Sequence, residues 1–144
     1  MNGFRFSLER VRSYKYSLEE QLKLQLAAVR RLQEEEEARL EDYRQARAGC
    51  PAIRGAVVAE DLLQEVALLE ALDSRITCQQ ERVARARLVA REKRDQVQVA
   101  MRERKVLDRL RDRQLQAYRY EAGRQEQKQI DEAAGNRYCR GRGD

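Results

Sequence analysis

Apolar residues recur every seven positions over a long stretch of the chain. Counted in sevens from Leu62, the first six positions are all apolar, and the column then turns basic at Arg104. A seven-residue repeat returns side chains to nearly the same face of an α-helix, so this column predicts a seam that packs on another helix. The column comprises Leu62, Leu69, Ile76, Val83, Ala90, Val97, Arg104, Arg111 and Tyr118, and a weaker column three residues on comprises Glu65, Leu72, Gln79, Ala86, Lys93, Ala100 and Leu107.

A second amphipathic stretch precedes the seam. Between about residues 4 and 47, apolar side chains recur at spacings of three and four or their sums, which predicts a first helix. Nothing within this stretch breaks a helix. Its apolar positions are Leu8, Val11, Leu18, Leu22, Leu26, Val29, Leu40 and Tyr43.

One convincing break separates the two stretches. Residues 48–56 hold the only proline, Pro51, and Gly49 there suits the end of a helix. The second helix is expected from about residue 57 to about residue 134, where Gly135 and Asn136 are stop signals, and residues 135–144 form a frayed tail. A short connection between two long amphipathic helices favours an antiparallel hairpin. The expected fold is therefore all-α, a single coiled-coil domain over residues 1–144.

The two predicted helices differ in length, and this sets an expected register. Folding the chain about residue 52 places position i opposite about position 105 − i, with Phe4 near Met101 and Leu8 near Val97. The first helix would then end where the seam loses its apolar character. Beyond Met101 the second helix is expected to project alone as a basic helix of roughly 50 Å.

Composition supports long helices over a globular fold. Charged residues make up 38% of the 144 residues and aromatic residues 6%, as in coiled coils. Residues 1–90 hold fifteen basic and fifteen acidic side chains, whereas residues 91–144 hold fifteen basic and ten acidic ones. The excess positive charge therefore lies in the last third and suggests an acidic partner. With no apolar run of membrane length and no signal peptide, a soluble cytoplasmic protein with free Cys50, Cys78 and Cys139 is expected.

Enzymatic chemistry is not expected. The chain has no histidine and no phosphate-binding glycine motif. A two-helix hairpin also offers no dry pocket to tune catalytic groups. An extended rod keeps the three cysteines apart, so we expect no metal and no cofactor. Nucleic-acid binding is disfavoured because acids interleave with the basic residues, and an interfacial membrane helix is disfavoured because the apolar face lacks Trp and Phe.

Four segments resemble the FliJ family, the soluble component of the flagellar type III export apparatus. They follow one another in the family's order and span nearly the whole chain. The segments are Phe4-Arg5-Phe6-Ser7-Leu8-Glu9-Arg10-Val11 with Leu18-Glu19-Glu20, Leu40-Glu41-Asp42-Tyr43, Arg102-Glu103-Arg104-Lys105-Val106-Leu107-Asp108-Arg109-Leu110, and Glu126-Gln127-Lys128-Gln129-Ile130-Asp131-Glu132.

The resemblance implies a stalk-like coiled coil that acts in flagellar protein export and motility. Its open end would insert into the hexameric ring of the export ATPase FliI and promote ring assembly, while the hairpin end would touch the export gate FlhA. Substrate chaperones are further candidate partners. The protein would be monomeric alone, cytoplasmic, and peripherally associated with the inner-membrane apparatus.

The expected binding residues fall into two sets. Those for the ATPase ring are Phe4, Phe6, Arg10, Arg102, Arg104, Lys105, Leu107, Arg109, Leu110, Arg111 and Tyr118. The resemblance places the gate contact on Leu40, Tyr43, Leu68 and Leu72, which the seam alone also explains for the leucines. The sequence departs from the family's pattern at Arg47, where a tyrosine can stand, and at Glu36, where a glutamine is expected.

Two alternatives to a flagellar adaptor remain. One is the homologous stalk protein of virulence type III secretion, the YscO family, although the Phe4-x-Phe6 opening favours the flagellar family. The other is a generic structural coiled coil that forms a dimer or filament.

Overall fold

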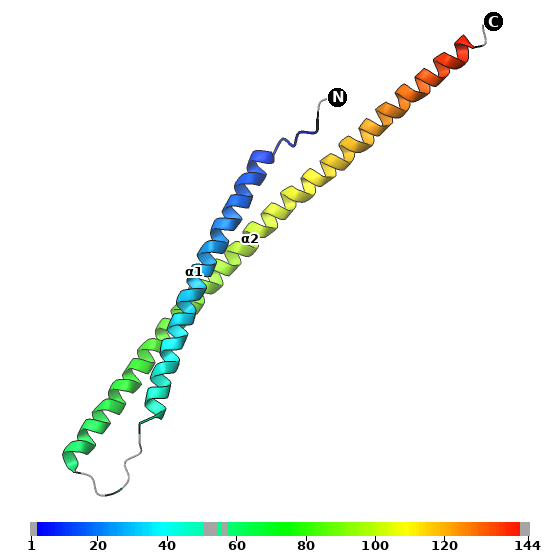
Figure 1. Cartoon of the computed structure of the whole chain (residues 1–144). Coiled ribbons are helices and arrows are strands. Elements are labelled where there is room, and N and C mark those ends of the chain that lie inside the picture. The colour runs from blue at the N-terminus through cyan, green and yellow to red at the C-terminus, as the bar shows by residue number, and fades with distance from the viewer. Residues whose placement is uncertain (1–2, 51–54, 56–57, 142–144) are drawn as a thin grey trace. The chain divides into compact units, whose positions relative to one another are not determined.

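The chain forms two α-helices, α1 (Glu9–Ala48) and α2 (Ala59–Arg140), shown in the computed structural model of Figure 1. The structure describes residues 3–50, residue 55 and residues 58–141, without the side chain of residue 139. The two helices pack against each other as a hairpin, so the predicted all-α hairpin fold is confirmed. Within the described residues, neither helix has a stretch long and apolar enough to cross a membrane.

Backbone packing divides the chain into two compact units, each built from parts of both helices. One unit is Leu18–Ala100, and the other combines Met1–Ser17 with Met101–Asp144. We refer to them as the middle unit and the terminal unit. The expectation of a single domain stays a prediction.

α1 begins at Glu9, later than the apolar pattern predicted. The Glu9 amide donates to the Phe6 carbonyl oxygen at 3.2 Å, and the Arg12 amide donates to the Leu8 carbonyl oxygen at 2.9 Å. Phe6 is buried although it precedes the helix. Apolar contact therefore orders the lead before the helix, and an apolar pattern alone does not distinguish such a lead from a first turn.

α2 ends at Arg140, beyond the stop expected at Gly135. Gly135 is exposed and has open space around its Cα atom. A single glycine costs a helix only about 1 kcal/mol relative to alanine, which does not stop it here. The Gly141 amide instead donates to the Arg137 carbonyl oxygen at 3.1 Å, so the terminating glycine is Gly141.

In the middle unit, α2 buries the two columns of positions that the seven-residue repeat identified. Val83 and Ala100 are each 3% exposed, and the partly buried positions between them keep the same three-and-four spacing. The seam prediction is confirmed over this unit. The buried α2 residues are Leu72, Gln79, Val83, Ala90, Val97 and Ala100, and those of α1 are Glu19, Leu26 and Leu40.

The register of the middle unit differs from the predicted one. Arg47 Nε lies 2.8 Å from Asp73 Oδ1, and Lys93 Nζ lies 2.9 Å from Gln25 Oε1. The two seams mesh when position i lies opposite about position 119 − i, so the predicted offset of 105 was wrong by about two heptads. The prediction assumed a tight turn, which would place the end of α1 beside the start of α2. Instead, α2 begins about 13 residues, or roughly 20 Å, beyond the end of α1.

The terminal unit has the same offset within itself. The rings of Phe4 and Tyr118 lie 5.8 Å apart, and Glu9 pairs with Arg111 at 3.7 Å. Phe4 therefore faces Tyr118 and not Met101. Glu9, the residue after Leu8, faces Arg111, so the predicted pairing of Leu8 with Val97 was also wrong.

The predicted projection of α2 from Met101 is therefore wrong. Residues 103–118 face the N-terminal segment, and every described side chain is exposed only from Gly123 onward. The stretch without a facing α1 residue is about 20 residues, or roughly 30 Å.

Polar residues occupy several seam positions that the apolar count passed over. Buried Gln79 donates from Nε2 to the Glu36 backbone oxygen at 3.0 Å and also to the Glu36 carboxylate. Glu19 is 1% exposed and pairs with Lys23 Nζ at 2.7 Å. In the terminal unit Leu8 and Val11, predicted as seam residues, are exposed, because Arg12 and Lys15 continue the spacing from Glu19.

Candidate protein interface

The terminal unit gathers most of the sequence signals for binding, and an aromatic contact orders its N-terminal lead. The rings of Phe4 and Tyr118 stack with a tilt of 50°. Phe6 is buried, while Phe4 and Tyr118 are partly buried. The contact of Phe4 with Tyr118 holds the lead on α2, so these aromatic residues support the surface around them more than they offer a free one.

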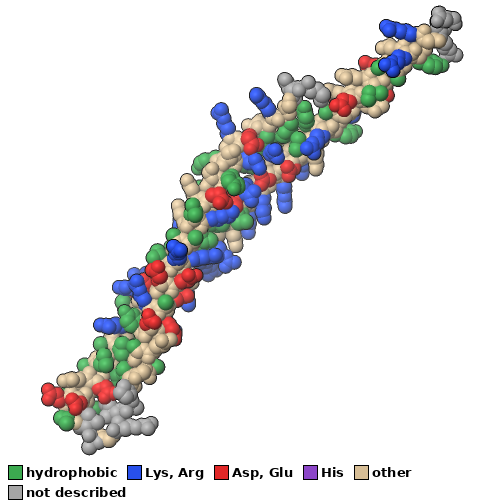
Figure 2. Space-filling model, viewed as in Figure 1, with side chains coloured by type: hydrophobic (Ala, Val, Ile, Leu, Met, Phe, Trp, Pro, Cys, Tyr) green, Lys and Arg blue, Asp and Glu red, His purple; other side chains and the backbone are tan. Residues whose placement is uncertain are grey.

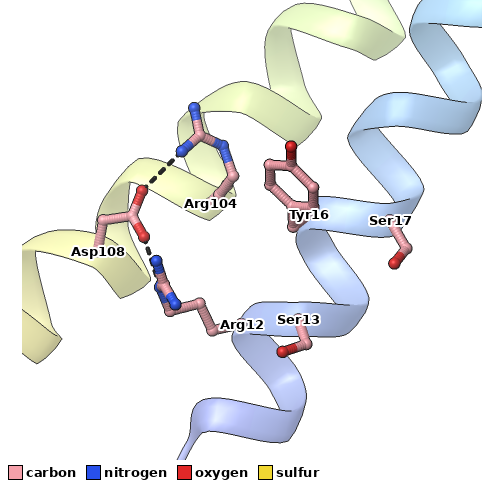
Figure 3. A pocket seen from close by; sticks show the side chains of 6 residues that line it. All are labelled: Arg12, Ser13, Tyr16, Ser17, Arg104 and Asp108. Carbon is pink, nitrogen blue, oxygen red and sulfur yellow. Dashed lines mark hydrogen bonds and ion pairs between the residues drawn. The ribbon is translucent and has the colours of Figure 1, made fainter.

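An ion-pair network fills the seam of the terminal unit where apolar residues cease. Asp108 accepts from Arg12 Nε at 2.7 Å and from Arg104 Nη1 at 2.7 Å, as Figure 3 shows. Arg12 also pairs with Glu9 at 2.8 Å. The hydrogen bonds to Asp108 and Glu9 raise the pKa of the Arg12 guanidinium, because both stabilise its charged form. Arg12 and Arg104 therefore continue the contact between the two helices through ion pairs, where apolar residues make it in the middle unit.

The hollow beside this network shows little capacity for chemistry. It has a volume of about 340 Å³, and Figure 3 shows the side chains that line it. The Asp108 carboxylate that lines it already accepts hydrogen bonds from both arginines. The lining residues are Arg12, Ser13, Tyr16, Ser17, Arg104 and Asp108. In the described part of the chain, no group of three Cys, Asp or Glu side chains is placed to hold a metal ion.

The outward face of α2 in the terminal unit carries unpaired cations. Four basic side chains are exposed, and none forms an ion pair within the residues that the structure describes. Val106, 63% exposed, lies among them. In Figure 2 many Lys and Arg side chains project from the surface in view. We call this set the basic stripe: Arg102, Lys105, Arg109 and Arg113 with Val106.

Two acids of the same segment pair with α1. Glu103 pairs with Lys15 at 2.6 Å, and Asp108 pairs with Arg12. Glu103 and Asp108 thus turn toward α1 and the basic stripe faces away from it, because positions three or four apart share a helix face. Asp112 is exposed, with 66% of its side chain accessible. The acids and bases of this segment are therefore partly, not fully, separated in space.

The structure brings together, in the terminal unit, all the residues predicted to bind an ATPase ring. Arg10, Arg102, Lys105 and Arg109 are exposed and available to a partner. The other seven are partly or fully buried: Phe4, Phe6, Arg104, Leu107, Leu110, Arg111 and Tyr118. The sequence reasoning missed Val106 and Arg113, although steps of four, three and four from Arg102 reach both.

The residues predicted to contact an export gate lie in the middle unit. Leu40 and Leu72 are buried seam residues, and Tyr43 is partly buried. Leu68 is 54% exposed and belongs to the first turns of α2, beyond the pair formed by Arg47 and Asp73. Of the four, only Leu68 presents most of its side chain to a partner.

Comparison with known proteins identifies one family. A family model described as "Flagellar FliJ protein" matches residues 4–143, nearly the whole chain. No curated protein and no solved structure matches the chain significantly.

Proposed function

The chain belongs to the FliJ family of flagellar type III export components, and we propose that it acts there as a stalk-like coiled coil. In this role it binds the hexameric export ATPase FliI, promotes its assembly and activity, and links it to the export gate FlhA. The protein is monomeric before it binds and associates peripherally with the inner-membrane export apparatus.

The basic stripe is the observation that best supports ATPase binding. A ring channel that accepts a helix needs a complementary charged surface, and unpaired cations steer an acidic partner over long range. Arg102, Arg109 and Arg113 have no intramolecular ion pair in the described residues to give up. The desolvation cost of docking is therefore met by new pairs with the partner, with no loss of internal ones.

Charge reversal tests this surface. The double variant Arg102→Glu/Arg109→Glu should weaken stimulation of ATP hydrolysis by the cognate export ATPase, shifting the half-maximal concentration about tenfold or more, since about 1.4 kcal/mol corresponds to a factor of ten. The matched control is Arg75→Glu/Arg82→Glu, which has the same spacing of seven, the same charge change and exposed positions in the middle unit. Equal stimulation by both variants, or no effect of the unmodified protein on ATP hydrolysis, would contradict the proposal.

Gate binding is proposed for the exposed first turns of α2 around Leu68, with Tyr43 on α1 in the same unit as a second contact. Leu68→Ser should weaken binding to the purified cytoplasmic part of the gate protein, measured by calorimetry. Leu24→Ser is the control, because Leu24 is exposed on α1. Equal affinity of the two variants would remove Leu68 from the contact.

A further inference from the structure

We infer that α1 has a second register on α2, displaced by one heptad toward the start of α2. In the observed register position i faces about position 119 − i, and in the second it faces about position 112 − i. This inference concerns the hairpin itself and does not depend on the proposed partners.

The first reason is that the seam of α2 is longer than the part that α1 covers. The apolar column starts at Leu62, but the last turn of α1 pairs at Asp73. Leu62, the first residue of this column, is 41% exposed. A displacement by one heptad would bring α1 over Leu69 and Glu65 with every seam position again facing a seam position, because both helices share the seven-residue spacing.

The second reason is that the displaced register places apolar seam residues opposite apolar ones and polar seam residues opposite polar ones in the middle unit. In the observed register Leu40 lies at the level of Gln79, and Leu26 at the level of Lys93. In the displaced register Leu40 faces Leu72, a second apolar pair.

Three polar seam residues of the middle unit also find polar partners after the displacement, whereas Arg12 and Lys15 would exchange Asp108 and Glu103 for Ala100 and Val97. Gln33 then faces Gln79, Glu19 faces Lys93, and Arg47 faces Glu65. The buried carboxylate of Glu19, which pairs with Lys23 at 2.7 Å in the observed register, would also come to the level of Lys93.

The third reason is the length of the connection, which fixes the direction of the displacement. Ten residues, 49–58, join the helices and reach at most about 33–36 Å. The observed register requires roughly 20 Å along the axis and about 10 Å across it. A displacement toward the start of α2 halves the axial distance, whereas the opposite displacement raises it to roughly 30 Å, close to full extension. Only one direction is favourable.

Specific side-chain contacts hold the observed register. In the middle unit these are the Gln79–Glu36 hydrogen bonds and the 2.7 Å pair between Arg87 and Glu37. α1 is one continuous helix, so the displacement also separates Arg12 from Asp108 in the terminal unit. A partner that binds the residues thus released would favour the displaced register, because a ligand shifts a two-state equilibrium by its differential affinity.

Engineered disulfides in the full-length chain test the inference. In a background with all three cysteines changed to serine, Val29→Cys/Ala90→Cys reports the observed register and Val29→Cys/Val83→Cys the displaced one. Val29→Cys/Val97→Cys is the matched control for displacement in the disfavoured direction. One heptad is about 10.5 Å, which is outside disulfide reach, so each pair reports one register.

Mild oxidation followed by non-reducing electrophoresis and mass spectrometry measures the intramolecular cross-link. The Val29/Val83 pair should form at least about five times faster than the Val29/Val97 pair. Equal rates for these two, with the Val29/Ala90 pair forming and helicity by circular dichroism retained in all three variants, would overturn the inference.

A further substitution tests whether all of α1 moves. Adding Asp108→Ala should raise the Val29/Val83 cross-linking rate about threefold, because it removes an ion-pair network made only in the observed register. Asp112→Ala, at an exposed position whose one ion pair among the described residues is with its neighbour Arg111 at 3.9 Å, should leave the rate unchanged. Equal effects of the two substitutions would contradict a displacement of the whole helix.

Discussion

Replacing Asp108 with alanine should loosen the N-terminal part of α1 while leaving the middle unit intact. The carboxylate accepts from Arg12 and Arg104, each at 2.7 Å, and the two arginines have 33% and 26% of their side chains exposed. Without it, Arg12 on α1 and Arg104 on α2 lose the acceptor that they share across the seam.

The expected loss is about 1 kcal/mol. Fully exposed ion pairs contribute roughly 0.2–1 kcal/mol, and hydrogen bonds to charged groups roughly 1.5–3 kcal/mol. Partial exposure places this network at the low end of the second range or below it, since water screens the charges. A loss of 1 kcal/mol corresponds to about a fivefold change in an opening equilibrium.

Hydrogen exchange read by mass spectrometry measures this change locally. Peptides covering residues 9–17 should exchange about fivefold faster in Asp108→Ala, and the difference should shrink in 1 M salt, where the screening length falls to about 3 Å. Peptides covering residues 18–48 should be unchanged. Uniform acceleration along α1, or no salt dependence, would refute the assignment of the effect to this ion pair.

Three further predictions concern the middle unit. Val83→Ala should lower the free energy of unfolding by about 2 kcal/mol in urea denaturation followed by circular dichroism, because Val83 is 3% exposed, whereas Leu63→Ala, at 70% exposure, should change it little. Gln79→Leu should raise thermal stability but also the Val29/Val83 cross-linking rate, because an apolar residue removes the register-specific bonds to Glu36; an unchanged rate would argue against Gln79 as a register determinant. Hydrogen bonds from Arg87 and Gln33 lower the pKa of Glu37 from its usual 4.5. The contribution of Glu37 to the free energy of unfolding is therefore present above pH 4.5 and is lost as the pH falls through the lowered pKa. Glu37→Gln should make stability less dependent on pH in that acid range, and an unaltered pH profile would count against the pairing.

The sequence predicted the helices and their contact faces because a single repeat encodes both. Positions such as Val83 and Ala90 are apolar at every seventh residue, so helix type and buried face follow from one observation. The register did not follow, because a repeat that matches at one offset also matches seven residues away. It depends on individual polar contacts, such as Gln79 with Glu36, that no apolar count contains.

The candidate binding surface was predicted in location but not in orientation. Reading Arg104 as the end of the helix contact treated a basic seam residue as a solvent-exposed one. In the structure Arg104 pairs with Asp108, which also pairs with Arg12 on α1, and the contact continues past Leu107 to Tyr118. Which arginines face a partner is decided by the pairing with α1, and this pairing could not be located without the register.

The repeat that makes the fold predictable also makes its register adjustable. An apolar seam alone stabilises several offsets almost equally, and polar residues within it select one of them. In the displaced register Glu19 would face Lys93 and Gln79 would face Gln33, so these polar residues do not exclude a second offset. Hence a protein built on this pattern can hold one alignment when free and adopt another when a partner supplies a modest difference in binding free energy.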